Sequence, residues 1–176
     1  VHLLMKKLKD AKITFMQATP VTWRMLSFAG WEGDPGLKVL CGGEALQQDL
    51  SNFLVTRCRE VWNMYAPTET TIWSSAHRVS FHPVPDRYEP IGTPLANNFF
   101  YVLDKYGKMV PEGVPGELYI GGKGVALGYY NNPALTKSRF HTDPFTGAAG
   151  GTMYQTGDLV KLLPNGVFEY LGRLDN

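Results

Sequence analysis

The stretch Leu37-Lys-Val-Leu-Cys-Gly-Gly-Glu44 decides the fold class of this chain. Leu37 to Cys41 is a short apolar run, which is typical of a buried strand, and the paired glycines end it where Glu44 opens a helix. Similar short apolar runs stand at 13–16 and at 61–64. Apolar residues at helical spacing lie between these runs, and strands that alternate with helices are typical of a parallel sheet with crossover helices.

A helix is predicted before each of the three strands. The middle helix has the clearest start, because Thr19 can cap it and Pro20 suits the first helical position, and its pattern continues to Phe28. The other two are indicated by apolar residues that share one helical face, namely Val1, Leu4, Met5 and Leu8 before the first strand, and Leu46, Leu50, Phe53 and Leu54 before the third.

The pattern changes from about Ile72. Residues 72–80 are consistent with one more strand, and a connection rich in proline follows it. Short apolar alternations separated by turn signals then continue to the end of the chain, which favours antiparallel strands. We therefore predict the C-terminal part of a parallel-sheet α/β subdomain over residues 1–80 and a small β-barrel subdomain over residues 81–176.

The composition excludes several classes of protein. The 176 residues are 44% hydrophobic and 19% charged, as in globular proteins, and no run of 18 apolar residues could span a bilayer. A net charge of +1 gives no excess field for nucleic acid or an anionic membrane surface. The two cysteines form no disulfide framework, and the four histidines share no metal-ligand spacing. We expect a soluble, cytoplasmic protein with neither nucleic acid nor membrane as partner.

Three segments occupy the carboxyl ends of the predicted parallel strands, where open sheets bind their ligands. They are Gln17, Gly42-Gly43-Glu44 and Asn63 to Glu69. The glycine pair would let a flat ligand lie against backbone, although a tight strand-to-helix turn explains two glycines better. The third segment offers an amide, an aromatic face, a hydroxyl and a carboxylate, and a helix start capped by Thr68 is an equal alternative.

Three later features have weaker interpretations. The glycine-rich run 116–128 lacks the spacing of a phosphate loop, and a bend in a barrel strand explains it better. Asp158, in Thr156-Gly-Asp158, could hold a ribose diol, and a turn aspartate is equally plausible. Taken alone, Arg173 and Asp175 are typical of solvated charges.

Taken together and in order, six stretches resemble the adenylate-forming superfamily and, within it, the amino-acid-activating adenylation domains of nonribosomal peptide synthetases. The resemblance covers nearly the whole chain, and six collinear motifs are far more specific than one. They are Gly42-Gly-Glu-Ala45; Asn63-Met-Tyr-Ala-Pro-Thr-Glu69; Ile91-Gly-Thr-Pro-Leu95 with Tyr101-Val-Leu-Asp104; Gly116-Glu-Leu-Tyr-Ile-Gly-Gly-Lys-Gly-Val-Ala-Leu-Gly-Tyr129; Tyr154-Gln-Thr-Gly-Asp158; and Glu169-Tyr-Leu-Gly-Arg-Leu-Asp175.

The resemblance implies that the chain binds ATP or AMP with Mg²⁺. Asn63 and Tyr65 would hydrogen-bond and stack the adenine, and Gly42, Gly43 and Glu44 would line the other side of the base. Asp158 would hold both ribose hydroxyls.

The same resemblance implies catalytic roles for Thr68, Glu69 and Arg173. Thr68 would donate to the α-phosphate or the substrate carboxylate, and Glu69 would be the carboxylate associated with Mg²⁺. Tyr170 and Arg173 would contact ribose and phosphate. Asp175 matches the hinge before a small C-terminal domain.

By motif, the resemblance also implies a pocket for the substrate side chain. Because none of its residues is charged, and an unpaired buried charge is costly, we expect an amino acid with an uncharged, medium-to-large, apolar or aromatic side chain. The pocket residues are Gln17, Leu40, Gly42, Met64, Ile72 and Trp73.

The chain departs from the family pattern in several places. Ala66 stands where the family has glycine, and Leu127 replaces an arginine. The family's phosphate loop and amine-binding aspartate would precede Val1, and its catalytic lysine would follow Asn176. We therefore interpret the sequence as a piece of a larger enzyme, inactive by itself.

The implied partners follow from the family. They are the amino-acid substrate, a peptidyl carrier protein domain with its phosphopantetheine, and a small accessory activator protein. Two alternatives remain: an acyl- or aryl-CoA synthetase of the same superfamily, and a non-catalytic docking module that keeps the fold. The stretches Tyr101 to Asp104 and Tyr170 to Asp175 favour the peptide-synthetase branch.

Overall fold

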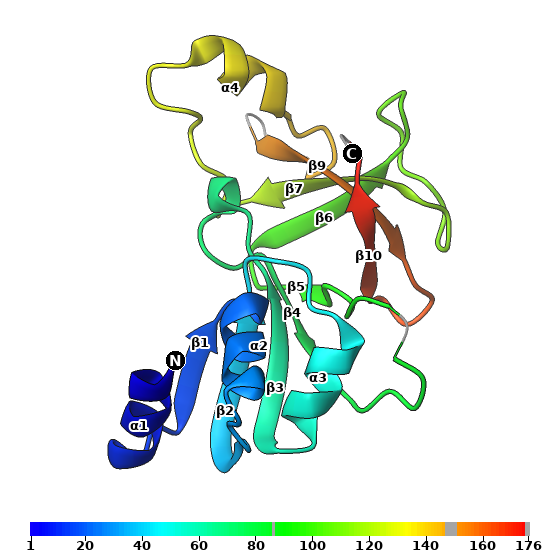
Figure 1. Cartoon of the computed structure of the whole chain (residues 1–176). Coiled ribbons are helices and arrows are strands. Elements are labelled where there is room, and N and C mark those ends of the chain that lie inside the picture. The colour runs from blue at the N-terminus through cyan, green and yellow to red at the C-terminus, as the bar shows by residue number, and fades with distance from the viewer. Residues whose placement is uncertain (86, 147–150, 175–176) are drawn as a thin grey trace. The chain divides into compact units, whose positions relative to one another are not determined.

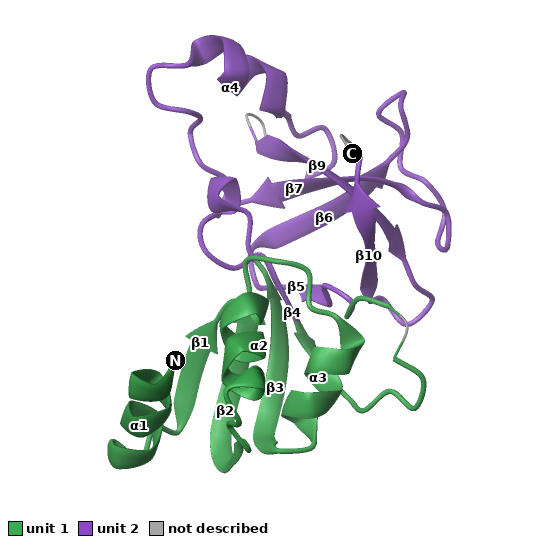
Figure 2. Cartoon of the chain, in the orientation of Figure 1, with its two compact units in different colours: residues 1–65, 77–89 green, residues 66–76, 90–176 purple. Residues whose placement is uncertain are grey.

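The computed structural model describes residues 1–85, 87–146 and 151–174. The chain divides into two compact units, which Figure 2 distinguishes by colour. Unit 1 consists of residues 1–65 and 77–89, and unit 2 of residues 66–76 and 90–176.

Unit 1 is built on a parallel sheet flanked by helices (Figure 1). The strands β1, β2 and β3 are neighbours in that order, and β4 follows them, with the unit boundary inside it. This confirms the predicted α/β class. Among the described residues, no helix has the length and apolar composition needed to cross a bilayer. The elements are α1 (His2–Asp10), β1 (Phe15–Ala18), α2 (Pro20–Phe28), β2 (Asp34–Gly42), α3 (Gln48–Val55), β3 (Cys58–Tyr65) and β4 (Ser75–Arg78).

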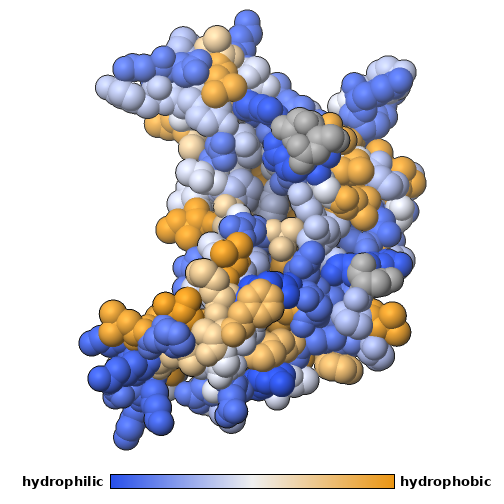
Figure 3. Space-filling view, in the orientation of Figure 1, coloured by the Kyte–Doolittle hydropathy of each residue, from blue (hydrophilic) through white to orange (hydrophobic). Residues whose placement is uncertain are grey.

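Helix α2 begins as its sequence predicts and carries apolar residues on two faces. The Thr19 side chain accepts a hydrogen bond from the Thr22 backbone N–H, and Pro20 occupies the first turn. The face with Trp23 and Leu26 is fully buried. The other face leaves Val21, Met25 and Phe28 at 54%, 45% and 81% exposure, and Figure 3 shows hydrophobic surface over α1 and α2.

The core of unit 1 packs against one face of the sheet. The rings of Trp23 and Trp31 lie 5.7 Å apart, and full burial of each large apolar side chain contributes about 1.5–3 kcal/mol. The buried members of this core are Leu8, Trp23, Leu26, Trp31, Leu37, Val39, Cys41, Leu46, Leu50, Leu54, Val61 and Val79.

A buried carboxylate joins α3 to the segment that follows β4 within unit 1. Glu89 is 1% exposed, accepts a hydrogen bond from the Ser51 hydroxyl, and pairs with His82 Nε2 at 3.0 Å. His77 Nε2 lies 4.0 Å from the same carboxylate. A buried charge is costly unless it is paired and hydrogen-bonded, so these partners keep Glu89 compatible with the interior.

Unit 2 contains an antiparallel sheet in the order β10-β9-β7-β6, with β8 paired to β9. In addition, β5 pairs with Ser75 and Ala76 of β4. The prediction of antiparallel strands is confirmed. The elements are β5 (Thr93–Pro94), β6 (Asn98–Leu103), β7 (Gly116–Gly122), α4 (Pro133–Arg139), β8 (Phe140–Thr142), β9 (Thr152–Leu162) and β10 (Phe168–Arg173).

The expected small β-barrel is not found in the described part of unit 2. Its strands form an open sheet, because β6 and β10 lie at opposite ends of the strand order and do not pair with each other. Closure into a barrel requires such a pairing. The turn signals between short apolar runs therefore predicted the antiparallel strands correctly but could not specify closure.

Two strand predictions also need correction. The expected strand over 72–80 begins only at Ser75, because Thr71 and Ile72 have φ angles of 61° and 63°, which are incompatible with a strand. Conversely, Thr156-Gly-Asp158 lies inside the long strand β9. Gly157 has a φ of 76°, and a glycine in this conformation admits an irregularity within a continuing strand.

The His77 site makes the stability of unit 1 depend on pH. Burial lowers the pKa of His77, and the nearby Glu89 only partly opposes this effect. The unfolded chain therefore binds a proton more readily than the folded chain, so stability falls as pH decreases through the unfolded value of about 6.5.

We predict that replacing His77 with Gln reduces the loss of thermal stability between pH 7.5 and pH 5.5. Thermal denaturation followed by circular dichroism measures this difference. The exposed His2→Gln variant is the control and should behave as the original protein. An unchanged pH dependence in His77→Gln would contradict the assignment.

Candidate functional site

Four of the six predicted pocket residues lie on one face of the parallel sheet. Gln17 of β1 is in register with Leu40 of β2, and Gly42 of β2 is in register with Met64 of β3. Leu40 and Gly42 are two residues apart in one strand, so all four positions share a face. Leu40 and Met64 are buried at 8% and 7% exposure, and Gln17 is exposed.

The opposite face at the same strand ends carries Cys41 and Asn63, which are in register with each other. Asn63 is 4% exposed, and Tyr65, two residues later, is half-buried. Burial raises the pKa of the Cys41 thiol to about 12, so this cysteine stays protonated and unreactive near neutral pH. Asn63 and Tyr65, predicted to contact adenine, therefore share one face of the sheet, and four of the six predicted pocket residues share the other.

Glycine is favoured at positions 42 and 43 for different structural reasons. A Cβ atom at Gly42 would lie 2.6 Å from the Met64 carbonyl oxygen, so the close approach of β3 requires glycine there. Gly43 has a φ of 90°, and a Cβ at this position would meet only Thr19 Cγ2 at 3.7 Å. Backbone conformation, rather than lack of space, therefore favours glycine at position 43.

Within unit 2, Thr68 and Glu69 lie on a single turn of 3₁₀ helix, η1 (Thr68–Thr70). The predicted alternative of a helix capped by Thr68 is wrong, because Pro67 is the N-cap residue and no side chain caps the turn. The turn is held by the chain that follows β7: the Ala126 N–H donates to the Glu69 carbonyl oxygen at 2.8 Å, and the Thr71 hydroxyl donates to the Gly124 carbonyl oxygen at 2.7 Å.

The Glu69 carboxylate has a partner that the sequence prediction missed. The Tyr129 hydroxyl donates a hydrogen bond to Glu69 Oε1 at 2.6 Å. Burial and this hydrogen bond raise the pKa of Tyr129, because a neighbouring carboxylate favours the neutral phenol. Tyr129 ends one of the six motif stretches, but no pattern near it in the sequence points to Glu69.

Asp158 and Arg173 lie directly opposite each other on β9 and β10. Arg173 Nη1 donates to Asp158 Oδ1 at 3.1 Å and to the Thr156 carbonyl oxygen at 2.8 Å. A register shift between Tyr170 and Gly172 brings about this pairing. Asp158 is 7% exposed and the Arg173 side chain is 37% exposed, so only the arginine end of the pair reaches the surface of unit 2.

The remaining predicted residues are less buried. Glu44 and Thr68 are exposed, Ile72 is 69% exposed, and Trp73 and Tyr170 are half-buried. Asp175, the predicted hinge residue, lies outside the described residues.

The chemistry at Glu69 fits a divalent cation that is bound together with phosphate. Its carboxylate is an oxygen ligand of the kind that Mg²⁺ prefers, and one of its oxygens is oriented by Tyr129. In the described part of the chain, His, Cys, Asp and Glu residues form no group of three or more suited to a metal ion. A cation at Glu69 would therefore take most of its ligands from substrate phosphates and water.

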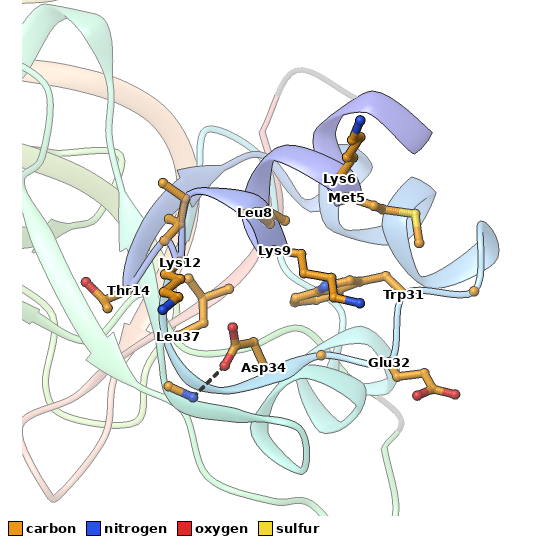
Figure 4. A pocket seen from close by; sticks show the side chains of 14 residues that line it. Met5, Lys6, Leu8, Lys9, Lys12, Thr14, Trp31, Glu32, Asp34 and Leu37 are labelled. Carbon is orange, nitrogen blue, oxygen red and sulfur yellow. Dashed lines mark hydrogen bonds between the residues drawn. The ribbon is translucent and has the colours of Figure 1, made fainter.

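A cavity of about 690 Å³ in unit 1 lies away from the candidate residues. It is formed by α1 and the segment that leads into β2, and Figure 4 shows Lys9, Trp31 and Asp34 around it, with Asp34 hydrogen-bonded to the backbone N–H of Gly36. It is thus at the amino end of β2, whereas ligands of parallel sheets bind at the carboxyl ends. We do not assign it to the candidate site.

Comparison with known proteins identifies close similarity over nearly the whole chain. The profile of the family described as AMP-binding enzyme matches residues 1–130. The PKS-NRPS hybrid synthetase acdB of Aspergillus candidus is 48% identical over 175 residues, which are 98% of this chain and 7% of the relative. The chain therefore spans only a small part of that relative's length.

Solved structures agree with this result. A four-domain nonribosomal peptide synthetase bound to AMP and glycine matches with a TM-score of 0.89 and 45% identity, covering 98% of this chain and 13% of its own. An artificially fused adenylation–PCP di-domain from Klebsiella oxytoca matches with a TM-score of 0.87 and 25% identity, covering 98% of this chain and 32% of its own.

The contact at Gly42 gives a test of the strand geometry. We predict that Gly42→Ala destabilises the protein by about 1–3 kcal/mol, because the added methyl group would overlap the β3 backbone. Gly36→Ala, in the same strand, is the matched control: its Cβ would meet only the Asp34 carboxylate, at 3.3 Å. Urea denaturation compares the two variants, and equal stabilities would contradict the predicted overlap.

Proposed function

This chain belongs to the AMP-binding enzyme family, and we propose that it is part of an adenylation domain of a nonribosomal peptide synthetase. In this proposal the complete enzyme uses ATP to convert an amino acid to an aminoacyl-adenylate and passes it to a carrier protein. The single observation that carries the proposal is the match, over 98% of the chain at 45% identity, to a peptide synthetase whose structure holds AMP and glycine. The small part of each relative that the chain spans supports the view that the functional domain is longer.

Residues of unit 1 would bind the base and the substrate side chain. Asn63 would hydrogen-bond the adenine edge and Tyr65 would stack against its face, a contact worth about 1–3 kcal/mol per base. Gly42, Gly43 and Glu44 would line the other side of the base. This arrangement fits the position of all these residues at the carboxyl ends of parallel strands.

Residues of unit 2 would bind the ribose and the phosphates. Asp158 would accept hydrogen bonds from the ribose hydroxyls, and Tyr170 with Arg173 would contact ribose and phosphate. The observed Arg173–Asp158 contact supports these neighbouring roles, because the hydrogen bond from Arg173 fixes the orientation of the Asp158 carboxylate.

The reaction would be attack of the amino-acid carboxylate on the α-phosphate of ATP, with release of pyrophosphate. Thr68 would donate a hydrogen bond to the α-phosphate or the substrate carboxylate. Mg²⁺, held through Glu69, would neutralise charge on the phosphates. The chain's own contribution is therefore positioning and charge stabilisation, with no covalent step on the protein.

The substrate would have an uncharged side chain. Gln17, Leu40, Gly42 and Met64 share one face of the sheet, and Ile72 and Trp73 would complete the pocket. A charged side chain would be left without an opposite charge among these groups, which is costly in a buried site.

The further elements of the proposal concern the rest of the enzyme. A peptidyl carrier domain would accept the acyl group on its phosphopantetheine thiol, and a small accessory activator protein would be a further partner. Asp175 would be the hinge to a C-terminal domain, and additional strands would close the antiparallel sheet of unit 2 into a small barrel.

Amino-acid-dependent exchange of pyrophosphate into ATP tests this function. We predict that the complete protein carrying this chain catalyses exchange with an apolar or aromatic amino acid, and that Asp158→Ala lowers the rate at least tenfold, or about 1.4 kcal/mol. Thr142→Ala, a change in the same unit outside the predicted site, is the control. No exchange with any amino acid would refute the function, and strong exchange with Asp, Glu, Lys or Arg would refute the proposed pocket.

A further inference from the structure

We propose that Tyr129 is a positioning residue that orients the Glu69 carboxylate for the divalent cation. This inference rests on the proposed function, because it takes Glu69 as the Mg²⁺-associated group. It adds a residue to which neither the sequence motifs nor the comparisons give a role.

A short hydrogen bond connects Tyr129 to Glu69. The Tyr129 hydroxyl lies 2.6 Å from Glu69 Oε1, a distance typical of a charge-assisted hydrogen bond to a carboxylate. Glu69 is half-buried on a short turn, where a glutamate without a partner would sample several rotamers. The bond to Tyr129 selects one direction for the carboxylate.

The Tyr129 ring is itself held in place by neighbouring aromatic rings. The rings of Tyr129 and Phe140 lie 5.5 Å apart at an angle of 77°, and Phe140 also packs against Tyr154 at 5.2 Å. Tyr154 is 7% exposed, so this aromatic group is anchored in the interior of unit 2. Burial raises the pKa of Tyr154, and the interactions of its hydroxyl with Tyr129 and Glu69 raise it further.

Backbone hydrogen bonds hold both Tyr129 and Glu69 in place. The Tyr129 N–H donates to Thr136 Oγ1 at 2.9 Å, and a Cβ atom at Gly128 would overlap Thr136. At the other end, the Glu69 carbonyl oxygen accepts from the Ala126 N–H. The segment that carries Tyr129 is therefore hydrogen-bonded to the turn of Glu69 both through its backbone and through the Tyr129 side chain. These bonds leave the Tyr129 and Glu69 side chains little conformational freedom.

A positioning role predicts more than a loss of stability. Groups that hydrogen-bond a metal ligand fix its orientation, and their removal commonly lowers metal affinity by about 10–100-fold. A tyrosine that merely packed in the core would lower thermal stability when truncated but would leave metal affinity unchanged in the folded protein.

Unit 2 contains a second tyrosine–carboxylate pair, which provides a control that separates a positioning role from a purely structural one. The Tyr101 hydroxyl donates to Asp143 Oδ2 at 3.1 Å, and both side chains are buried. Tyr101→Phe therefore removes the same chemical group from the same kind of bond, with no connection to Glu69. Glu69→Gln reports whether Glu69 binds the cation at all.

The experiment measures Mn²⁺ binding to the complete protein in the presence of ATP, from the electron paramagnetic resonance signal of free Mn²⁺. We expect Tyr129→Phe to raise the Mn²⁺ Kd by about tenfold. Tyr101→Phe should leave the Kd within about twofold of the original value, and thermal denaturation establishes that each variant is folded. In a Glu69→Gln background, Tyr129→Phe should cause no further loss, because residues that act as one unit are not additive.

The outcomes separate the inference from the function on which it rests. An unchanged Kd in folded Tyr129→Phe, or equal losses in Tyr129→Phe and Tyr101→Phe, would overturn the positioning role and leave the function intact. Should Tyr129→Phe fail to fold, Tyr154→Phe is the second variant: an unchanged Kd in it would likewise overturn the role. An unchanged Kd in Glu69→Gln would refute the metal role of Glu69 and the inference with it, while exchange activity tests the function independently.

Discussion

The fixation of the turn η1 by the segment after β7 is the constraint on which the proposed role of Glu69 depends. Glu69 sits on a turn too short to hold itself, since a single 3₁₀ turn has few internal hydrogen bonds. The bonds from Ala126 and Thr71 fix its backbone, and the bond from Tyr129 fixes its side chain. The half-buried carboxylate is thereby fixed in one direction, as the proposed binding of a phosphate-bound cation would require.

In unit 1, the register of the parallel strands determines which residues lie on each face of the sheet. Because residues in register on parallel strands point to the same face, β1, β2 and β3 sort their last residues into two sets. One face receives Leu40, Gly42 and Met64, and the other receives Asn63 and Tyr65. Glycine at position 42 is the condition for this register, since β3 passes too close for a side chain. A requirement of packing and a proposed role in binding thus fall on the same residue.

Local patterns in the sequence predicted most of the α/β part, and non-local contacts explain the errors. The three helices and three strands of residues 1–65 follow from apolar spacing and from the Thr19-Pro20 start signal, and the structure confirms that all six are present. Some of their bounds differ: the first strand lies at Phe15–Ala18 instead of 13–16, and the third helix begins at Gln48 instead of Glu44. Apolar residues occupy two faces of α2, so its spacing alone could not tell which face is buried. The continuation of β9 to Leu162 could not be predicted, because Gly157 resembles a turn when its neighbours across the sheet are unknown.

In the candidate site, too, local motifs predicted single residues but not the contacts between residues that are distant in the sequence. Motifs placed Asp158 and Arg173 separately, and the structure adds that a register shift brings them into contact. Tyr129 lies 60 residues from Glu69 in the sequence, so no local pattern could connect them. Barrel closure was also beyond local signals, because it depends on pairing between strands far apart in the chain.

A crystal structure of the complete protein with AMP and Mg²⁺ tests the central claim most directly, because the claim assigns separate parts of one nucleotide to named residues. The account predicts electron density for adenine against Tyr65, with the ribose hydroxyls on the Asp158 carboxylate. Ordered AMP away from both residues, in crystals where the two side chains are well resolved, would contradict it.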